Sequence, residues 1–280
     1  MPSTAGFVAH DILPGMQVVT SAANPVVKRV RQLADRKHRR RQQAFVVEGL
    51  QPVWRAAQAG CRFEALIVAP ELLANQAALA MVADLERDGV PVTRVSAELF
   101  GRISDRDGPA GLAAIVAGGL AGLDSLTVQA DSVFVVLHEL ANPGNIGTIV
   151  RTADAAGAAG MILLGSTADP LSGPAIKASM GSVFAVPTVA VSEAQELLDW
   201  ARAQGCQLAA MTGGGASDLW QTGLPRPLLV LLGNEGNGLP DELLAAADLR
   251  VRIPMTGTAE SLNVAAAAAV VLFELARRAG

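Results

Sequence analysis

Glu235 is the single acid in a turn that contains three glycines, GNEGNG, at residues 233–238. Glycine has no Cβ, so the backbone N–H and C=O groups of such a turn can approach a ligand closely. The turn follows the aliphatic run 228–232, which is typical of a buried parallel strand, and ligands of open α/β sheets bind at the carboxyl ends of strands. Its glycine spacing matches neither the dinucleotide fingerprint nor the P-loop. We interpret the turn either as a binding loop built from main-chain atoms or as a plain surface turn.

Two further polar loops are expected at strand ends. Residues 256–260 and residues 212–215 each follow a short predicted strand. The first of these loops leads into Ser261, Leu262 and Asn263, which open an alanine-rich helix. Loops that offer backbone groups rather than many charged side chains suit a ligand with an adenine ring, a ribose and an apolar link. The three loops together are expected to enclose one cofactor.

Asn145 is placed to cap a helix predicted over residues 146–156, after a turn at residues 142–144. Arg151 lies almost two turns further along the same helix. Both side chains are able to face a loop that packs over the helix. A surface or capping charge also explains a lone helical arginine, so the pattern alone leaves the role of Arg151 open.

Residues 28–41 are strongly basic in a chain whose formal net charge is −4. Against the single acid Asp35, the cations of this segment are Lys28, Arg29, Arg31, Arg36, Lys37, Arg39, Arg40 and Arg41. Lys and Arg side chains bind phosphates and release the counterions condensed on nucleic acids. A cationic block on an otherwise acidic protein therefore predicts contact with RNA or DNA. A solvated helix face or a flexible arm is the alternative interpretation.

Composition indicates a globular protein with buried cores, because 51 % of the 280 residues are hydrophobic. No apolar run approaches the roughly 18–20 residues of a membrane span, and residues 1–17 lack the basic start and apolar core of a secretory signal. We therefore expect a cytoplasmic protein that spans no membrane. Two cysteines and three scattered histidines offer neither a disulfide framework nor metal-ligand spacing, so no metal is expected.

Alternating strand and helix patterns predict an α/β fold with two domains. Residues 18–117 are expected to form a small α/β domain and residues 132–280 a second one. The glycine-rich segment 118–131 is predicted to be an exposed linker, and residues 1–17 a disordered leader. Among the predicted elements are helices at residues 26–36 and 71–88 and a proline-containing strand at residues 183–189.

Three ordered segments carry a family resemblance: NPGNIGTIVRTADAAGA, LLGNEGNGLPDELL and IPMTGTAESLNVAAAAAVVLFE. They resemble the three motifs of the SpoU/TrmH family of RNA ribose 2′-O-methyltransferases, within the SPOUT superfamily. The resemblance spans roughly residues 133–278. Residues 18–48 are similar to the start of the substrate-binding domain that many ribosomal-RNA members carry, which resembles a small ribosomal protein of the kink-turn-binding type.

The resemblance implies a deep trefoil knot, in which the C-terminal helix passes through a loop, and an S-adenosylmethionine site within that knot. By the same resemblance, Gly233, Ile253 and Leu262 hold the cofactor through backbone groups, with Met211 or Thr212 nearby. The functional polar positions of the family correspond to Arg151, Asn145, Glu235, Ser261 and Asn263. Because the family completes its active site across two subunits, a homodimer through the second domain is also implied.

The resemblance further implies an S-adenosylmethionine-dependent RNA (ribose-2′-O)-methyltransferase, with ribosomal RNA as the expected substrate because of the additional first domain. Methylation of transfer RNA, or of ribosomal RNA as antibiotic self-protection, is one alternative. A non-catalytic RNA- or ribosome-binding protein is another. The family assigns activation of the hydroxyl to the arginine that Arg151 matches. Since a guanidinium is a poor base, we expect Arg151 to bridge the hydroxyl and a phosphate and to stabilise the alkoxide as it forms.

Overall fold

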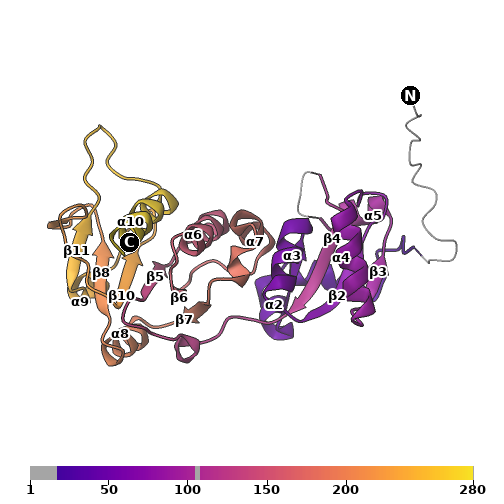
Figure 1. The fold of residues 1–280 in the computed structure, drawn as a ribbon, viewed down its shortest axis with the longest axis horizontal. Helices are drawn as coiled ribbons and strands as arrows, with labels where there is room; N and C mark the ends of the chain where they lie inside the picture. Colours follow the sequence, from indigo (N-terminus) through magenta and orange to yellow (C-terminus); the bar gives the residue numbers. More distant parts are fainter. Residues whose placement is uncertain (1–17, 105–107, 280) are drawn as a thin grey trace. The chain divides into compact units, whose positions relative to one another are not determined.

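The computed structural model describes residues 18–104 and 108–279, so the leader expected at residues 1–17 lies outside the described residues. The chain divides into two compact units, with the division between Gly119 and Leu120. Each unit has a sheet covered by helices (Figure 1).

The first unit is built on a four-stranded sheet with the order β1-β4-β2-β3. Its strands are β1 (Ala44–Glu48), β2 (Phe63–Val68), β3 (Val92–Arg94) and β4 (Leu112–Ala117). Strand β4 pairs antiparallel with both β1 and β2, and β3 pairs parallel with β2. Its helices are α1 (Pro25–Leu33), α2 (Arg36–Gln42), α3 (Leu50–Gln58), α4 (Gln76–Arg87) and α5 (Ala97–Gly101). Alternate residues of β2 and β4 face one core with α1 and α5, as the two-residue period of a strand requires.

The basic segment is broken into two helices, whereas the sequence predicts one helix at residues 26–36. Asp35 causes the break, because its carboxylate accepts a hydrogen bond from the Lys37 backbone N–H at 2.7 Å and so caps α2. The helix predicted at residues 71–88 likewise begins later, at Gln76, because the Asn75 side chain accepts from the Ala78 N–H at 3.1 Å. Short polar side chains thus fix both helix starts.

The second unit contains a seven-stranded sheet with the order β7-β6-β5-β10-β8-β11-β9, and every neighbouring pair in it is parallel. Its strands are β5 (Val133–His138), β6 (Gly160–Leu164), β7 (Thr188–Val191), β8 (Gln207–Met211), β9 (Ser217–Asp218), β10 (Leu228–Leu232) and β11 (Leu249–Arg252). Strand β10 lies between β5 and β8, with Leu232 opposite both Leu137 and Met211. The carboxyl ends of these central strands therefore meet at one edge.

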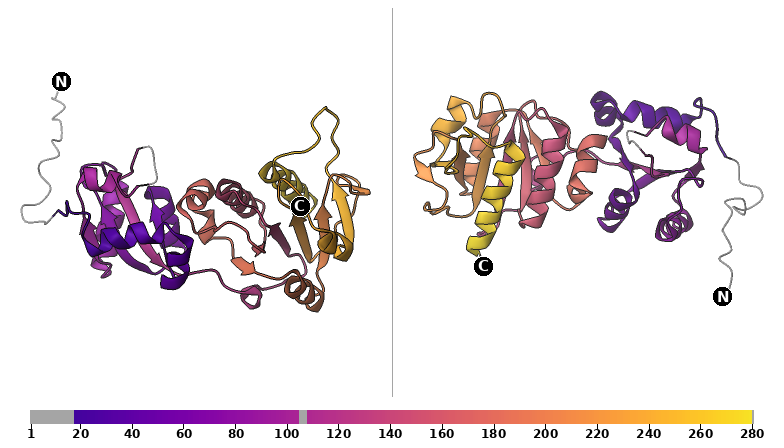
Figure 2. Two further views of the ribbon diagram at one scale, coloured as in Figure 1. Left: turned by 180° about the vertical axis from the view of Figure 1, so that it is seen from behind. Right: turned by 90° about the horizontal axis from the view of Figure 1, so that it is seen from above.

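Helices cover both faces of this sheet (Figure 1, Figure 2). They are α6 (Pro143–Ala155), α7 (Gly173–Ser179), α8 (Ala194–Ala203), α9 (Asp241–Ala246) and α10 (Val264–Ala279), with short 3₁₀ turns η1 (Leu123–Ser125) and η2 (Ser182–Phe184). Helices α6, α7 and α10 lie on one face and α8 and α9 on the other. The second unit is thus a mixed α/β fold with a parallel sheet, as the α/β prediction requires.

The start of α6 differs from the prediction. Asn142, not Asn145, caps this helix, because its side chain accepts hydrogen bonds from the N–H groups of Gly144 at 2.8 Å and Asn145 at 3.4 Å. Pro143 occupies the first helical position, where its missing N–H is no loss. The side chain of Asn145 is therefore free for other contacts.

Two further segments differ from the sequence-based expectation. Residues 183–189 are not one strand: η2 comes first, and β7 begins only at Thr188, directly after Pro187. Within the expected linker 118–131, Leu123 is only 5 % exposed and belongs to the core of the second unit. Ala121 also forms a parallel bridge with Val189. Part of this segment therefore packs with the second unit.

Within the described ranges, no helix is both long enough and apolar enough to cross a membrane.

Candidate functional site

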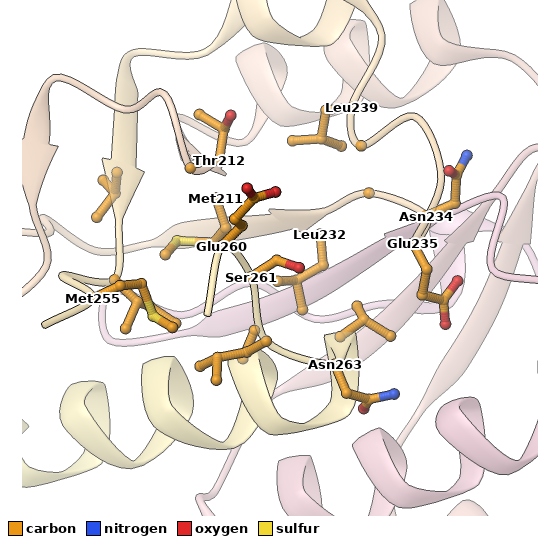
Figure 3. Close-up of a pocket in the computed structure, with 18 residues that line it drawn as sticks. Met211, Thr212, Leu232, Asn234, Glu235, Leu239, Met255, Glu260, Ser261 and Asn263 are labelled. Carbon is orange, nitrogen blue, oxygen red and sulfur yellow. The ribbon is translucent and has the colours of Figure 1, made fainter. Parts of the chain in front are cut away.

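A pocket of about 410 Å³ opens at the carboxyl edge of β8, β10 and β11 (Figure 3). This volume lies in the range of roughly 300–1,000 Å³ that is typical of small-molecule sites. The three strand-end loops and the first turn of α10 line it. All five residues predicted to contact the cofactor lie in this lining: Met211, Thr212, Gly233, Ile253 and Leu262. The structure therefore brings together loops separated by up to about fifty residues of sequence.

The loop after β10 folds back against its own backbone. Glycine is therefore needed at position 233 for loop packing, whereas the sequence suggested that it lets a ligand approach the backbone. A Cβ placed on Gly233 would lie 2.1 Å from the carbonyl carbon of Gly238, so only glycine fits there. Asn234 and Gly238 form an antiparallel bridge. The Asn234 side chain accepts from the N–H groups of Gly236 at 3.0 Å and Asn237 at 2.7 Å. The glycine thus lets the loop pack against its own backbone.

Three polar side chains from distant segments meet beside the pocket. The Asn145 carboxamide nitrogen on α6 donates to Glu235 Oε1 at 2.5 Å, and that of Asn263 donates to Asn145 Oδ1 at 3.4 Å. Asn263 also accepts from the Ala265 N–H at 2.9 Å, which caps α10. Glu235 and Asn263 line the pocket itself. One hydrogen-bonded chain therefore joins α6, the β10 loop and the start of α10.

Of the two other residues predicted to be catalytic, one lines the pocket and the other does not. Ser261 belongs to the lining, next to Asn263. Arg151 lies outside it, with an exposed side chain on α6. Within the described part of the chain this guanidinium has neither a hydrogen bond nor an ion pair. A single chain therefore does not bring Arg151 into the pocket.

The pocket contains a second carboxylate, that of Glu260, which belongs to the predicted polar loop at residues 256–260 and had no expected role. The charged side chains among the described lining residues are Glu235 and Glu260, and no lysine or arginine is among them. Much of the remaining lining is aliphatic, and it includes the partly exposed side chains of Met255 and Leu262. Position next to Ser261 was the one sequence signal that pointed to Glu260.

The predicted RNA-contacting cations of the first unit fall into two groups. Five side chains are exposed: Lys28, Arg31, Lys37, Arg40 and Arg41. The other three are partly or fully buried. Arg29 donates to Glu64 at 2.5 Å and to Gln42 at 3.0 Å. The exposed group, rather than all eight residues, presents charge to solvent.

Arg39 has a structural role in the first unit. Its side chain is 7 % exposed, and one guanidinium nitrogen donates to the carbonyls of Leu33 at 2.8 Å and Ala34 at 2.7 Å. These carbonyls end α1 and lack partners within the helix. Arg39 thus joins the two basic helices, and its guanidinium is directed inward rather than toward RNA.

Hydrogen bonds from Arg278 connect the end of α10 to another segment of the second unit, and an ion pair within the helix holds the Arg278 side chain. Arg278 donates to the carbonyls of Leu219 and Thr222, in the segment after β9. Glu274 accepts hydrogen bonds from Arg277 and Arg278, and these hold the pKa of its carboxyl far below the ordinary value of 4.5, at about 2. The helix that begins at the pocket is therefore anchored near its other end.

No cluster of three or more histidine, cysteine or acidic side chains among the described residues is arranged to hold a metal ion.

Residues 132–273 match the SpoU rRNA Methylase family, and residues 24–114 match the MRM3-like substrate binding domain. The first match covers more than half of the 280 residues. The chain belongs to the SpoU rRNA Methylase family. The resemblance stated from the three motifs is thereby confirmed, and the match to the second domain type includes most of the first unit.

Proteins similar to this chain include two that are named as 23S rRNA 2′-O-methyltransferases. The 23S rRNA (uridine(2479)-2′-O)-methyltransferase of Streptomyces viridochromogenes is 30 % identical over 88 % of this chain and 87 % of its own length. The 23S rRNA (guanosine(2553)-2′-O)-methyltransferase RlmP of Bacillus subtilis is 28 % identical over 93 % of this chain and 99 % of its own length. The crystal structure of AdoMet-bound rRNA methyltransferase from Sinorhizobium meliloti superimposes with a TM-score of 0.84 at 37 % identity, and covers 94 % of this chain and 98 % of that one.

Proposed function

We propose that this SpoU family member transfers the methyl group of S-adenosylmethionine to a ribose 2′-hydroxyl of ribosomal RNA. The observation that carries the proposal is the convergence of Asn145, Glu235 and Asn263 beside the pocket. These residues come from the three motifs of the family, and hydrogen bonds join them. The relatives named as 23S rRNA 2′-O-methyltransferases support ribosomal RNA as the substrate class.

The pocket residues fit the cofactor. When bound, S-adenosylmethionine supplies an electrophilic methyl group on a positively charged sulfur. The pocket offers main-chain groups at Gly233 and Ile253, aliphatic side chains such as Leu232 and Leu239, and carboxylates but no cations among its described lining. Apolar walls suit an adenine ring, and the negative charge suits a cationic ligand.

Arg151 has the proposed role of stabilising the ribose oxygen while that oxygen bonds to the methyl group, the bond between the methyl group and sulfur breaks, and the hydroxyl proton passes to solvent water. A guanidinium has a pKa above about 12 and is a poor base, but it donates several hydrogen bonds at once to an oxyanion and a phosphate. Placing the hydroxyl in line with the methyl group contributes further, on the order of 7–11 kcal/mol of the barrier in the best cases. Asn145 and Glu235 are proposed to hold the ribose or the loop in the orientation this requires.

The active site is proposed to be completed by a second copy of the chain. Arg151 is exposed and lies outside the pocket of its own chain, which supports a site supplied by two subunits. The proposed homodimer forms through the second unit. The trefoil knot is part of the same proposal, supported by the match of residues 132–273 to the SpoU family.

The first unit is proposed to bind the RNA substrate through its exposed cations on α1 and α2. The match to a substrate-binding domain supports this role. We also propose that the first unit resembles a ribosomal protein of the kink-turn-binding type. The same proposal includes a cytoplasmic location of the protein and activity without a metal ion.

Mapping ribose 2′-O-methyl groups in a deletion strain tests the proposed function. We expect one ribosomal RNA nucleotide to lose its methyl group, and the wild-type gene but not an Arg151→Ala gene to restore it. Loss of methylation from transfer RNA instead would move the substrate to that class. If no RNA changed and the purified protein bound no S-adenosylmethionine, a non-catalytic RNA-binding role would replace the proposal.

A further inference from the structure

Glu260 is a charged pocket residue without a hydrogen-bond or ion-pair partner among the residues that the structure describes. It lines the pocket, and within the described ranges its carboxylate forms neither a hydrogen bond nor an ion pair. Figure 3 draws it among the lining residues, with the carboxylate directed toward the side of the pocket that carries Thr212 and Leu239. The other lining carboxylate, Glu235, is engaged by Asn145. Glu260 is therefore the acid available to a ligand.

The methyl donor and its product differ in charge at the sulfur atom, so a carboxylate in the pocket can distinguish between them. S-adenosylmethionine carries a permanent positive charge on its sulfur, and S-adenosylhomocysteine, which remains after transfer, has a neutral thioether at the same place. The two molecules share the adenosine, the ammonium group and the carboxylate. A protein group that attracts only the sulfonium therefore acts on one of them and not on the other.

We propose that Glu260 is a specificity-determining residue, which raises the affinity of the pocket for the cationic methyl donor relative to its neutral product. The inference rests on the proposed function, because it takes S-adenosylmethionine as the ligand. Glu260 lies in a lining whose remaining described side chains include no cation to neutralise it. The pocket thus favours loading of the donor and release of the spent product.

Calorimetric titration of the full-length protein with each molecule tests the inference. The ratio of the two affinities is compared among wild type, Glu260→Gln and a control, Glu242→Gln. Glu242 is an exposed acid on α9 outside the pocket lining, so the control removes the same charge elsewhere. We expect Glu260→Gln to lower the preference for the donor about two- to fivefold, as for a solvent-exposed ion pair, and to leave the affinity for the product nearly unchanged.

Ionic strength supplies an independent measurement. At about 1 M salt the screening length falls to about 3 Å. The preference of the wild type for the donor over the product should then approach that of Glu260→Gln. The preference of Glu260→Gln itself should change less with salt. Glu260→Asp keeps the charge on a shorter side chain and should retain part of the preference. Circular dichroism verifies that each variant is folded.

Two results would overturn the inference. Equal weakening of donor and product by Glu260→Gln would assign the carboxylate to the shared ammonium group or to the loop itself. An unchanged ratio would remove any charge selection by Glu260. Failure of the proposed function has a different signature, because the wild-type protein would then bind neither molecule.

Discussion

Asn145 can join two partners because its carboxamide both donates and accepts hydrogen bonds. It donates to Glu235 and accepts from Asn263, which aspartate or serine could not reproduce with the same geometry. This use of the side chain depends on Asn142, which takes over the cap of α6. Of two asparagines three residues apart, one thus caps α6 and the other joins the β10 loop to the start of α10.

Gly233 and Gly236 provide a matched pair of substitutions in one loop. Gly233→Ala forces a Cβ into the backbone of Gly238, whereas the nearest atom to a Cβ on Gly236 is Asn234 Oδ1, at 3.6 Å. We expect Gly233→Ala to lower the free energy of unfolding by about 1–3 kcal/mol and to abolish measurable binding of S-adenosylmethionine. Gly236→Ala should change both much less. Chemical denaturation and calorimetry measure the two effects, and equal behaviour of the variants would contradict the self-packing of the loop.

The sequence predicts which residues line the pocket better than it predicts why those residue types are needed there. The three motifs and the glycine turn led to Gly233, Glu235 and Asn263, which the fold places around one pocket. Glycine is required at position 233 because a Cβ there would overlap the backbone of Gly238. The path of the loop that brings residue 238 back to residue 233 cannot be read from the spacing of the glycines. Glu260 was given no role because an acid in a polar loop, even next to Ser261, is shown to line a pocket only once the loop is folded.

At the level of elements, the basic segment forms two short helices joined by capping and by a buried arginine. Sequence identified the charge but not the break, since helical periodicity continues through Asp35 while its capping preference interrupts it. Strands such as β10 were predicted closely because continuous aliphatic runs are buried on both faces. Sheet order was not predictable, because the pairing partners are distant in sequence.

Arg39 and Arg40 are neighbours, but substitution by glutamine should affect a different property at each position. We expect a loss of stability at Arg39 and a loss of RNA binding at Arg40. Arg39→Gln removes buried hydrogen bonds from a charged donor, so we expect the free energy of unfolding to fall by about 1.5–3 kcal/mol. Arg40 is exposed, so Arg40→Gln should leave stability within about 0.5 kcal/mol.

RNA binding gives the complementary readout for this pair. Arg40→Gln should weaken binding and lower the slope of log affinity against log salt by about 0.7–0.9 if Arg40 contacts one phosphate. Denaturation and salt-dependent filter binding measure the two quantities. An unchanged slope for Arg40→Gln, together with a stable Arg39→Gln protein, would contradict the division between exposed and buried cations.

Glu274 should make the anchoring of α10 sensitive to acid. Hydrogen bonds from Arg277, then Arg278, lower the pKa of its carboxyl from 4.5 to about 2 in the folded protein. Because the folded pKa is the lower one, these contacts stabilise the protein above pH 4.5, and the stabilisation is lost as the pH falls toward about 2.

Thermal unfolding between pH 6 and pH 2 tests this dependence. We expect the unfolding midpoint of Glu274→Gln to fall less steeply below pH 4.5 than that of the wild type, with Glu242→Gln as the control for a lost exposed acid. Parallel curves for Glu274→Gln and the wild type would show that α10 is held in other ways.

For the whole molecule, the position of Arg151 predicts complementation between inactive variants. Arg151→Ala and Glu235→Gln should each lose most methyltransferase activity as pure proteins. If each site takes Arg151 from one subunit and Glu235 from the other, a dimer that contains both variants has one intact site. Mixing and subunit exchange should then restore roughly a quarter of the wild-type activity.

The controls for complementation are each variant mixed with itself and the double variant mixed with wild type. Analytical ultracentrifugation tests whether the protein forms the proposed dimer. Dimers that exchange subunits without recovering activity would place both residues in the same site of one chain and would remove the shared-site proposal.

The place of β10 in the sheet also bears on how the protein is made. The strand lies between β5 and β8 but follows both in the chain, so both present unpaired edges until residue 232 has left the ribosome. Exposed strand edges are sites of aggregation, and late long-range pairing slows folding. The second unit thus gains its central strand only after β5 and β8 have both been synthesised, and a nascent chain stalled before β10 would depend on chaperones to remain dispersed.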